Sequence, residues 1–244
     1  AFDYALKIGK IPIVVNDKRG FFTTRVFERY AKEGMALLSE GNHPVSIESA
    51  GKIAGFPVGP LAVIDEISIQ LLADIRSQSR KDFADKKHQE PTEPWDRVID
   101  YMLGKAKRPG RASGKGFYEY SQKNEKYIWP GIVKRFQSSQ NQSSQKEMME
   151  RFYFSQAIEA VRCLEEKVLL SVADANIGSI YGWGFPLFTG GVIQYINNYG
   201  LEKFRNRANK LSDKHGERFC PPKPVSYTHL RAHETKANLV CRRL

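Results

Sequence analysis

The chain has 244 residues, of which 41% are hydrophobic and 27% are charged, and this balance is typical of a globular protein with two domains. No apolar run approaches the roughly 20 residues of a membrane-spanning helix, so we expect no membrane span. The three cysteines are widely spaced and form no C-x-x-C motif, which favours a reducing cytoplasm and no disulfide framework.

The net charge of +11 has three possible explanations. Scattered basic residues on a solvated surface are the plainest interpretation. A cluster of Lys and Arg within residues 105–115 favours an anionic small-molecule ligand as the second. Nucleic acid comes third and we do not expect it, because no aromatic residues alternate with the basic ones and no helix-turn-helix pattern is present.

Residues 1–17 resemble the end of an α/β domain. Residues 1–9 read as the end of a helix, and the apolar run Ile11–Val15 ends at Asn16 and Asp17, which predicts a buried strand. A lone helix and strand do not fold by themselves. We therefore interpret this segment as a remnant of a larger α/β domain upstream.

From Thr23 onward the apolar residues recur with helical spacing. The pattern predicts a helix that ends at Gly41-Asn42, a second that starts near Ser46, and a third that starts at Gly59-Pro60. After an exposed connection, a short helix over residues 95–103 and a short strand over 117–120 are expected. Residues 121–145 contain the polar run SSQNQSSQ, which is typical of a linker.

Two stretches read as copies of one helical unit, the first over residues 25–60 and the second over 151–191. Glu33 and Glu159 are 126 residues apart, and the two Gly-Phe-Pro turns that begin at Gly55 and Gly184 are 129 apart. A slowly drifting offset is typical of a duplicated domain with small loop insertions, not of a short-period solenoid. The sequence therefore predicts an all-α fold with a duplicated helical domain.

The last twenty residues, 225–244, resemble translated sequencing-adapter DNA, so we expect a non-native tail. His229 and His233 imitate an H-x-x-x-H metal pattern there, but no third ligand is evident and we predict no metal site. The expected organisation is a remnant (1–17), a first helical domain (18–121), a linker (122–145), a second helical domain (146–224) and the tail (225–244).

Five motifs occur in the order found in one enzyme family. IPIVVNDKRGFFTTR (11–25), GFPVGP (55–60), RASGKGFY (111–118), VRCLEE (161–166) and IYGWGFP (180–186) resemble the helical C-terminal part of 3-hydroxyacyl-CoA dehydrogenases of the multifunctional fatty-acid oxidation type. The resemblance covers residues 1–222. It implies a C-terminal fold like that of 6-phosphogluconate dehydrogenase, behind a remnant of the NAD-binding domain.

The resemblance implies NAD-linked oxidation of a (3S)-3-hydroxyacyl-CoA in fatty-acid β-oxidation. Such a reaction needs a base at the hydroxyl group and a bound nicotinamide. The family's H-F-F-N-P stretch and a G-x-G-x-x-G loop are both missing from the chain, so we expect no catalytic residue here and predict that the chain alone is inactive. We expect a substrate-binding and dimerising portion, either in a homodimer or in a complex with a thiolase subunit.

The resemblance also implies three site residues. Thr24 stands where the family has a substrate-contacting Asn, and Tyr181 matches a substrate-contacting Tyr of the multifunctional proteins. We expect the two to open onto a common cleft. The family's cofactor-contacting Lys falls on Ala112, so neighbouring Arg111 is the candidate for a contact to NAD phosphates.

Two rival interpretations remain open from sequence. One is a non-catalytic helical module that serves only for dimerisation, since the helices carry enough apolar surface for either role. The other is the C-terminal domain of a different β-hydroxyacid dehydrogenase, such as the 6-phosphogluconate type. The duplicated helical unit and the two Gly-Phe-Pro turns favour the acyl-CoA enzyme.

Overall fold

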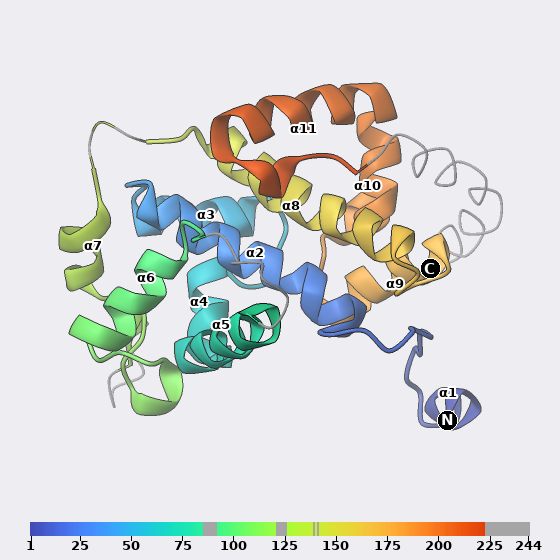
Figure 1. The fold of residues 1–244 in the computed structure, drawn as a ribbon, viewed down its shortest axis with the longest axis horizontal. Coiled ribbons are helices and arrows are strands. Elements are labelled where there is room, and N and C mark those ends of the chain that lie inside the picture. The colour runs from blue at the N-terminus through green and yellow to red at the C-terminus, as the bar shows by residue number, and fades with distance from the viewer. Residues whose placement is uncertain (85–91, 121–125, 139, 141, 223–244) are drawn as a thin grey trace. The chain divides into compact units, whose positions relative to one another are not determined.

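The structure is a computed structural model that describes residues 1–84, 92–120, 126–138, 140 and 142–222. Helices dominate it, and the described residues contain one two-stranded sheet (Figure 1). The predicted all-α class is confirmed. The α-helices are α1 (Phe2–Lys7), α2 (Phe21–Ser39), α3 (Pro44–Ile53), α4 (Pro60–Ile67), α5 (Ile69–Ala84), α6 (Asp96–Asp100), α7 (Pro130–Phe136), α8 (Gln145–Glu165), α9 (Val172–Trp183), α10 (Val192–Tyr199) and α11 (Leu201–His215).

Shorter elements fill the connections. A π-helical turn, η1 (Tyr101–Lys105), continues α6, and 3-10 turns occur at η2 (Arg111–Ser113), η3 (Leu187–Thr189) and η4 (Glu217–Phe219). Strand β1 (Tyr118–Tyr120) pairs antiparallel with β2 (Lys126–Ile128). The expected short helix over 95–103 and the expected strand over 117–120 are therefore confirmed.

The duplication is visible in the order of elements. In each copy a long helix (α2 or α8) precedes a shorter one (α3 or α9), a Gly-Phe-Pro turn and a further short helix (α4 or α10). A side chain on the second helix accepts hydrogen bonds from the first amides of the last one. Glu48 Oε1 accepts from Leu61 N at 2.6 Å in the first copy, and Asn176 Oδ1 accepts from Ile193 N at 2.9 Å in the second.

By compactness the chain divides into two units, each built from separate stretches. One comprises Ala1–Tyr30, Ala54–Pro57 and Glu150–Leu244, and the other comprises Ala31–Ile53 and Val58–Met149. The core of the first unit is aromatic: Phe154 of α8 stacks on Phe204 of α11 at 4.2 Å between ring centroids. Beside them, Tyr153 stacks on Tyr195 of α10 at 4.7 Å.

The two Gly-Phe-Pro turns lie against each other within the first unit. Phe56 and Phe185 meet edge to face at 5.8 Å between centroids. A Cβ at Gly55 would lie 2.8 Å from Phe188 Cε1, and one at Gly184 would lie 2.7 Å from Pro57 Cγ. Both glycines have positive φ, 93° and 76°, a region that other residues rarely adopt. Each turn therefore requires glycine for two reasons: the backbone has a positive φ, and atoms of the other turn and its flanking residues come too close for a side chain.

In the second unit two buried carboxylates accept hydrogen bonds from residues 117–120, which include strand β1. Asp65 of α4 accepts hydrogen bonds from Phe117 N at 2.8 Å and Tyr120 Oη at 2.9 Å, and Glu48 accepts one from Tyr118 Oη at 2.7 Å. Burial raises the pKa of both carboxyl groups. These hydrogen bonds satisfy the buried carboxylate oxygens and fix residues 117–120 within this unit.

Two sequence expectations are corrected. The predicted strand over 11–15 is wrong: the segment is extended but pairs with no strand of the described residues, and Ile11 and Val14 are exposed. A strand needs a neighbour to satisfy its amides, and none is available here. The third helix, expected as one helix from Pro60, is two helices, α4 and α5, because Ser68 between them has a left-handed φ of 82°.

The stretch expected as a linker, 122–145, holds β2 and α7, and whether it separates two domains stays a prediction. The expected tail, with His229 and His233, lies outside the described residues, as do residues 85–91 of the connection after α5. Within the part of the chain that is described, no helix has the length and apolar character to cross a membrane.

Candidate functional site

A pocket of about 390 Å³ opens in the first unit between the segment after α1, the start of α2 and one face of α9. Its size is within the range typical of small-molecule sites. It is lined by Gly9, Lys10, Ile11, Ile13, Thr23, Ile177, Gly178, Tyr181 and Gly182. The isoleucines make apolar walls, while the Thr23 and Tyr181 hydroxyls and the Lys10 amine supply polar groups.

Helix α9 is set firmly at both ends, and this places Tyr181. Ser171 caps its start: Ser171 Oγ accepts a hydrogen bond from Asp174 N at 3.2 Å. Gly184, in the left-handed conformation, ends the helix and its amide donates to Ile180 O. Ile177, Gly178, Tyr181 and Gly182 all share one face at helical spacing, and that face forms one side of the pocket.

The segment on the opposite side is tied down by Asn16. Its backbone amide donates to Val168 O at 2.8 Å, and its side-chain amide donates to Lys167 O at 2.7 Å. Ile13 fits against α9 at Gly178, where a Cβ would lie 2.7 Å from Ile13 Cδ1. The segment therefore serves as a wall of the pocket.

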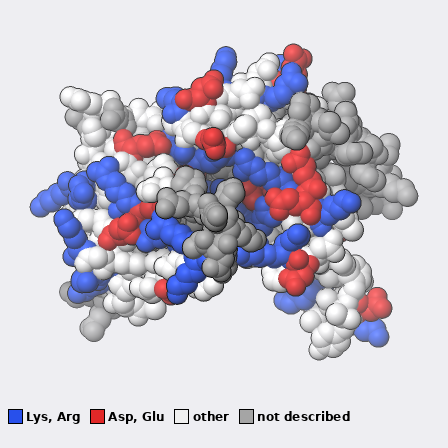
Figure 2. All heavy atoms as spheres, viewed as in Figure 1, with Lys and Arg blue, Asp and Glu red and all other residues white. Residues whose placement is uncertain are grey.

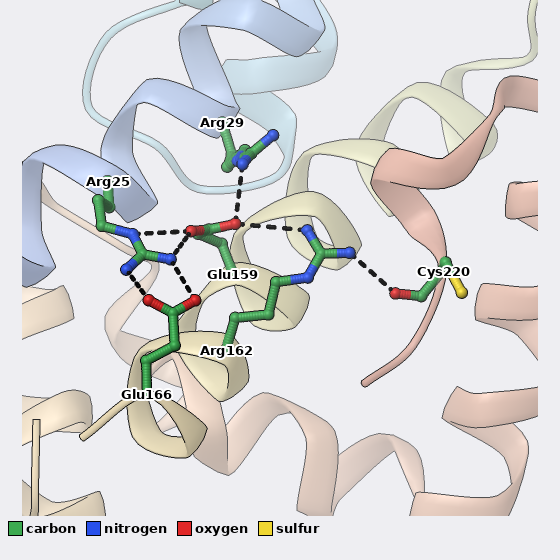
Figure 3. A network of polar contacts seen from close by, with 6 residues as sticks. All are labelled: Arg25, Arg29, Glu159, Arg162, Glu166 and Cys220. Carbon is green, nitrogen blue, oxygen red and sulfur yellow. Dashed lines mark hydrogen bonds and ion pairs between the residues drawn. The ribbon is translucent and has the colours of Figure 1, made fainter. Parts of the chain in front are cut away.

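A charged network anchors the first turns of α2 (Figure 3). Arg25 of α2 donates from Nε and Nη2 to Glu159 Oε1 of α8, at 2.9 and 2.6 Å, and also to Glu166. Arg29 and Arg162 reach the other oxygen of Glu159, at 2.9 and 3.4 Å. The network fixes the first turns of α2 on α8, one residue beyond the Thr23-Thr24 pair.

Glu159 is a fully enclosed counter-ion, with its side chain only 3% exposed. Burial alone would disfavour its charge, but Arg29 and Arg25 outweigh burial and hold the pKa of this carboxyl below its usual value. The hydrogen bond that Arg25 donates to Glu166 and the charge of Glu159 raise the pKa of Arg25, against the effect of its burial. Glu159 and Arg25 are therefore both charged at neutral pH.

The structure places the three predicted site residues differently. Tyr181 lines the pocket, and its side chain is 58% exposed. Thr24 is exposed and does not line the pocket, whereas its neighbour Thr23 does. Successive helical residues point about 100° apart, so only one of the two threonines can face α9. The sequence motif drew attention to Thr24, and only the helix orientation distinguishes Thr23.

Arg111 belongs to the second unit and has a partner of its own. It forms an ion pair with Glu66 at 2.5 Å and lies over the Tyr120 ring at 5.8 Å from the centroid. A phosphate would compete with Glu66 for this guanidinium group. Its role toward a cofactor stays a prediction. In the described residues no group of His, Cys, Asp and Glu is arranged to hold a metal ion.

The basic residues do not gather into one patch on the face shown in Figure 2. Lys and Arg side chains alternate there with Asp and Glu, as expected of a solvated surface. Cys163 is fully buried, and burial raises the pKa of its thiol to about 12. Of the residues that line the pocket, the sequence indicated only Tyr181 as a site residue. The helical spacing of Gly178 and Gly182 to Tyr181 was a signal for these two glycines, whereas no sequence signal pointed to Lys10.

Comparison with known proteins gives three kinds of match. The family described as "3-hydroxyacyl-CoA dehydrogenase, C-terminal domain" matches residues 20–120. The fatty acid oxidation complex subunit alpha of Vibrio cholerae is 36% identical over 218 residues, which are 89% of this chain and 30% of the relative. The chain thus spans less than a third of the curated relatives that it matches.

Two solved structures share the fold. The dehydrogenase part of multifunctional enzyme 1 from C. elegans superposes with a TM-score of 0.67 at 23% identity, over 93% of this chain and 51% of that one. The 3-hydroxybutyryl-CoA dehydrogenase of Escherichia coli K12 gives 0.66 at 18% identity, over 93% and 63%. The chain is thus similar to the C-terminal domain of 3-hydroxyacyl-CoA dehydrogenases in sequence over residues 20–120, and similar in fold to two dehydrogenase structures over 93% of its length.

Proposed function

We propose that this chain is the substrate-binding C-terminal portion of an NAD-dependent (3S)-3-hydroxyacyl-CoA dehydrogenase of fatty-acid β-oxidation. The observation that carries the proposal is the pocket in which Tyr181 meets Thr23 between apolar walls. The relatives named as fatty acid oxidation complex subunit alpha support the same substrate class. The non-catalytic module and the sugar-acid enzyme have no comparable support.

The pocket suits an acyl thioester because it combines apolar walls with hydroxyl donors. The acyl chain would lie along Ile11, Ile13 and Ile177, and the Tyr181 and Thr23 hydroxyls would donate to the thioester or 3-oxygen atoms. Lys10 would face the negative charge of the CoA moiety. Thr24, exposed on the next position of α2, stays a predicted contact to parts of the substrate outside the pocket.

NAD would supply the hydride acceptor in this chemistry. The sequence has no glycine-rich phosphate loop, and Arg111, its candidate cofactor contact, is paired with Glu66. This chain would therefore bind and orient the acyl group, while the base and the dinucleotide site belong to another part of the enzyme. On its own the chain would be inactive.

We further propose a cytoplasmic protein that assembles with other subunits, either a second copy or a thiolase. The relatives are named as the subunit of a complex, which supports assembly in general. A reducing compartment fits Cys163 and Cys220, which are both free thiols.

The test joins this chain to the NAD-binding half of the Vibrio cholerae relative and measures acetoacetyl-CoA-dependent oxidation of NADH. We expect activity from the joined protein, no activity from either half, and binding of acetoacetyl-CoA to the 244-residue chain alone. A chain that binds acetoacetyl-CoA no better than free CoA, and a joined protein without activity, would contradict the proposed function.

A further inference from the structure

One side of the pocket lacks side chains where a helix would normally present them. Gly178 and Gly182 lie one turn apart on the face of α9 that also carries Tyr181. Neither has a φ in the left-handed region, so the backbone does not require glycine at either position. Glycine in a helix weakens it relative to alanine. We therefore explain the two glycines by the space that their missing side chains leave in front of α9.

The two positions differ in what a side chain would meet. At Gly178 a Cβ would lie 2.7 Å from Ile13 Cδ1 and 3.5 Å from Phe22 Cε1, so this glycine permits close packing. At Gly182 the nearest atom is Thr23 Cγ2 at 3.2 Å, and no other atom outside the local helix backbone lies within 4 Å. A side chain at 182 would thus extend mainly into the pocket.

The direction of a helical side chain strengthens this contrast. Side chains on a helix lean toward its N-terminus and cover the preceding turn. A leucine at 182 would extend along this face of α9 into the pocket, beside Ile177 and Tyr181. It would fill the part of the pocket that the Thr23 and Tyr181 hydroxyls do not occupy, which is where an acyl chain would run.

We propose that Gly182 determines the acyl-chain length that this site accepts, because its missing side chain leaves room for a straight acyl chain longer than four carbons beside Thr23. This inference rests on the proposed function and adds to it the residue that selects among substrates. Each methylene group that enters the pocket would tighten binding about fourfold.

The experiment compares butanoyl-CoA with octanoyl-CoA, titrated calorimetrically into the 244-residue chain, for the natural sequence and for Gly182→Leu. The natural chain should bind octanoyl-CoA at least about tenfold more tightly than butanoyl-CoA, and Gly182→Leu should reduce this ratio to about threefold or less. Gly104→Leu is the matched control, because Gly104 faces open space outside the pocket, and it should keep the full ratio.

The outcomes separate the two proposals. If Gly182→Leu keeps the natural ratio, or if the natural chain binds both esters equally, the chain-length role is wrong while acyl-CoA binding stands. If the natural chain binds neither ester better than free CoA, the proposed function fails and the chain-length role fails with it. Gly182→Ala, which adds one methyl group to the helix, should give an intermediate ratio and serves as the test if the leucine variant does not fold.

Discussion

Single side chains decide how α2 is held and what faces the pocket. Arg25 fixes the helix start on α8 through Glu159, and Thr23, two residues earlier, then faces α9. Thr24 points elsewhere because of the helical rotation between neighbours. The contact that the family resemblance assigns to Thr24 and the contact that the pocket assigns to Thr23 can be separated by substitution.

We expect Thr23→Val to weaken binding of acetoacetyl-CoA to the chain by about fivefold, the value of one net hydrogen bond. Tyr181→Phe should have a similar effect without loss of stability, since the Tyr181 side chain is 58% exposed. Thr24→Val is the matched comparison, with the same loss of a hydroxyl on the exposed side. Calorimetric titration measures all three, and a large loss with Thr24→Val alone would assign the contact to Thr24.

A second prediction concerns Glu159, which balances three arginines. Glu159→Gln keeps the shape but removes the buried charge, and should lower the free energy of unfolding by about 2 kcal/mol. Glu166→Gln is the control: the Glu166 side chain is 48% exposed, so its loss should cost about 0.5 kcal/mol or less. Urea unfolding at neutral pH measures both, and equal effects would contradict the central role of Glu159.

The same carboxylate gives a dependence on pH with a definite sign. Because the pKa of Glu159 is lower in the folded chain than in the unfolded one, its stabilisation is complete above the unfolded value of about 4.3 and is lost as the pH falls through the folded value. The stability difference between the natural chain and Glu159→Gln should therefore be constant near neutral pH and shrink below about pH 4. A difference that grows on acidification would contradict this.

At the scale of elements, the two copies of the helical unit share one hydrogen-bonding arrangement at the start of a helix. A glycine-started helix receives a side-chain acceptor from the helix before it, Glu48 in one copy and Asn176 in the other. Glycine is required at the contact, since a Cβ would lie 2.3 Å from Glu48 Oε2 at Gly59 and 2.5 Å from Asn176 Cβ at Gly191. The acceptors differ in charge, but the geometry is shared.

The paired Gly-Phe-Pro turns give the element-scale prediction. Gly55→Ala and Gly184→Ala should each lower the free energy of unfolding by about 2–3 kcal/mol, since each forces both a positive φ and a clash with the opposite turn. Gly9→Ala is the control: φ is 71° there but nothing lies within 4 Å, so about 1 kcal/mol is expected. Thermal unfolding measures the series, and equal costs at all three glycines would show that the turns do not press on each other.

At the scale of the whole molecule, the strongest sequence-based expectation concerns the end of the chain. Residues 225–244 resemble translated adapter DNA, so a truncation before Val225 should leave the melting temperature within about 2 °C of the natural value. Calorimetric melting of the two chains side by side checks this. A clear loss of melting temperature in the shorter chain would show that the segment contributes to the fold.

The amino-acid sequence determined the helical class and the duplication, and it indicated the resemblance to 3-hydroxyacyl-CoA dehydrogenases, because apolar spacing, helix caps and Gly-Phe-Pro turns are local features of the chain. The helix start at Gly59-Pro60 was recognisable for the same reason. The break between α4 and α5 was not, since the left-handed Ser68 is held by contacts with the distant Pro109.

Only the tertiary structure decided which groups share the pocket. Thr23 and Gly182 are 159 residues apart in the chain, and their meeting depends on the rotation of α2 and α9 about their axes. Likewise, residues 11–15 have the composition of a strand but form a pocket wall, since pairing needs a neighbouring strand and no described one is in place. Local preference sets the elements, whereas the position of each side chain follows from how the elements pack.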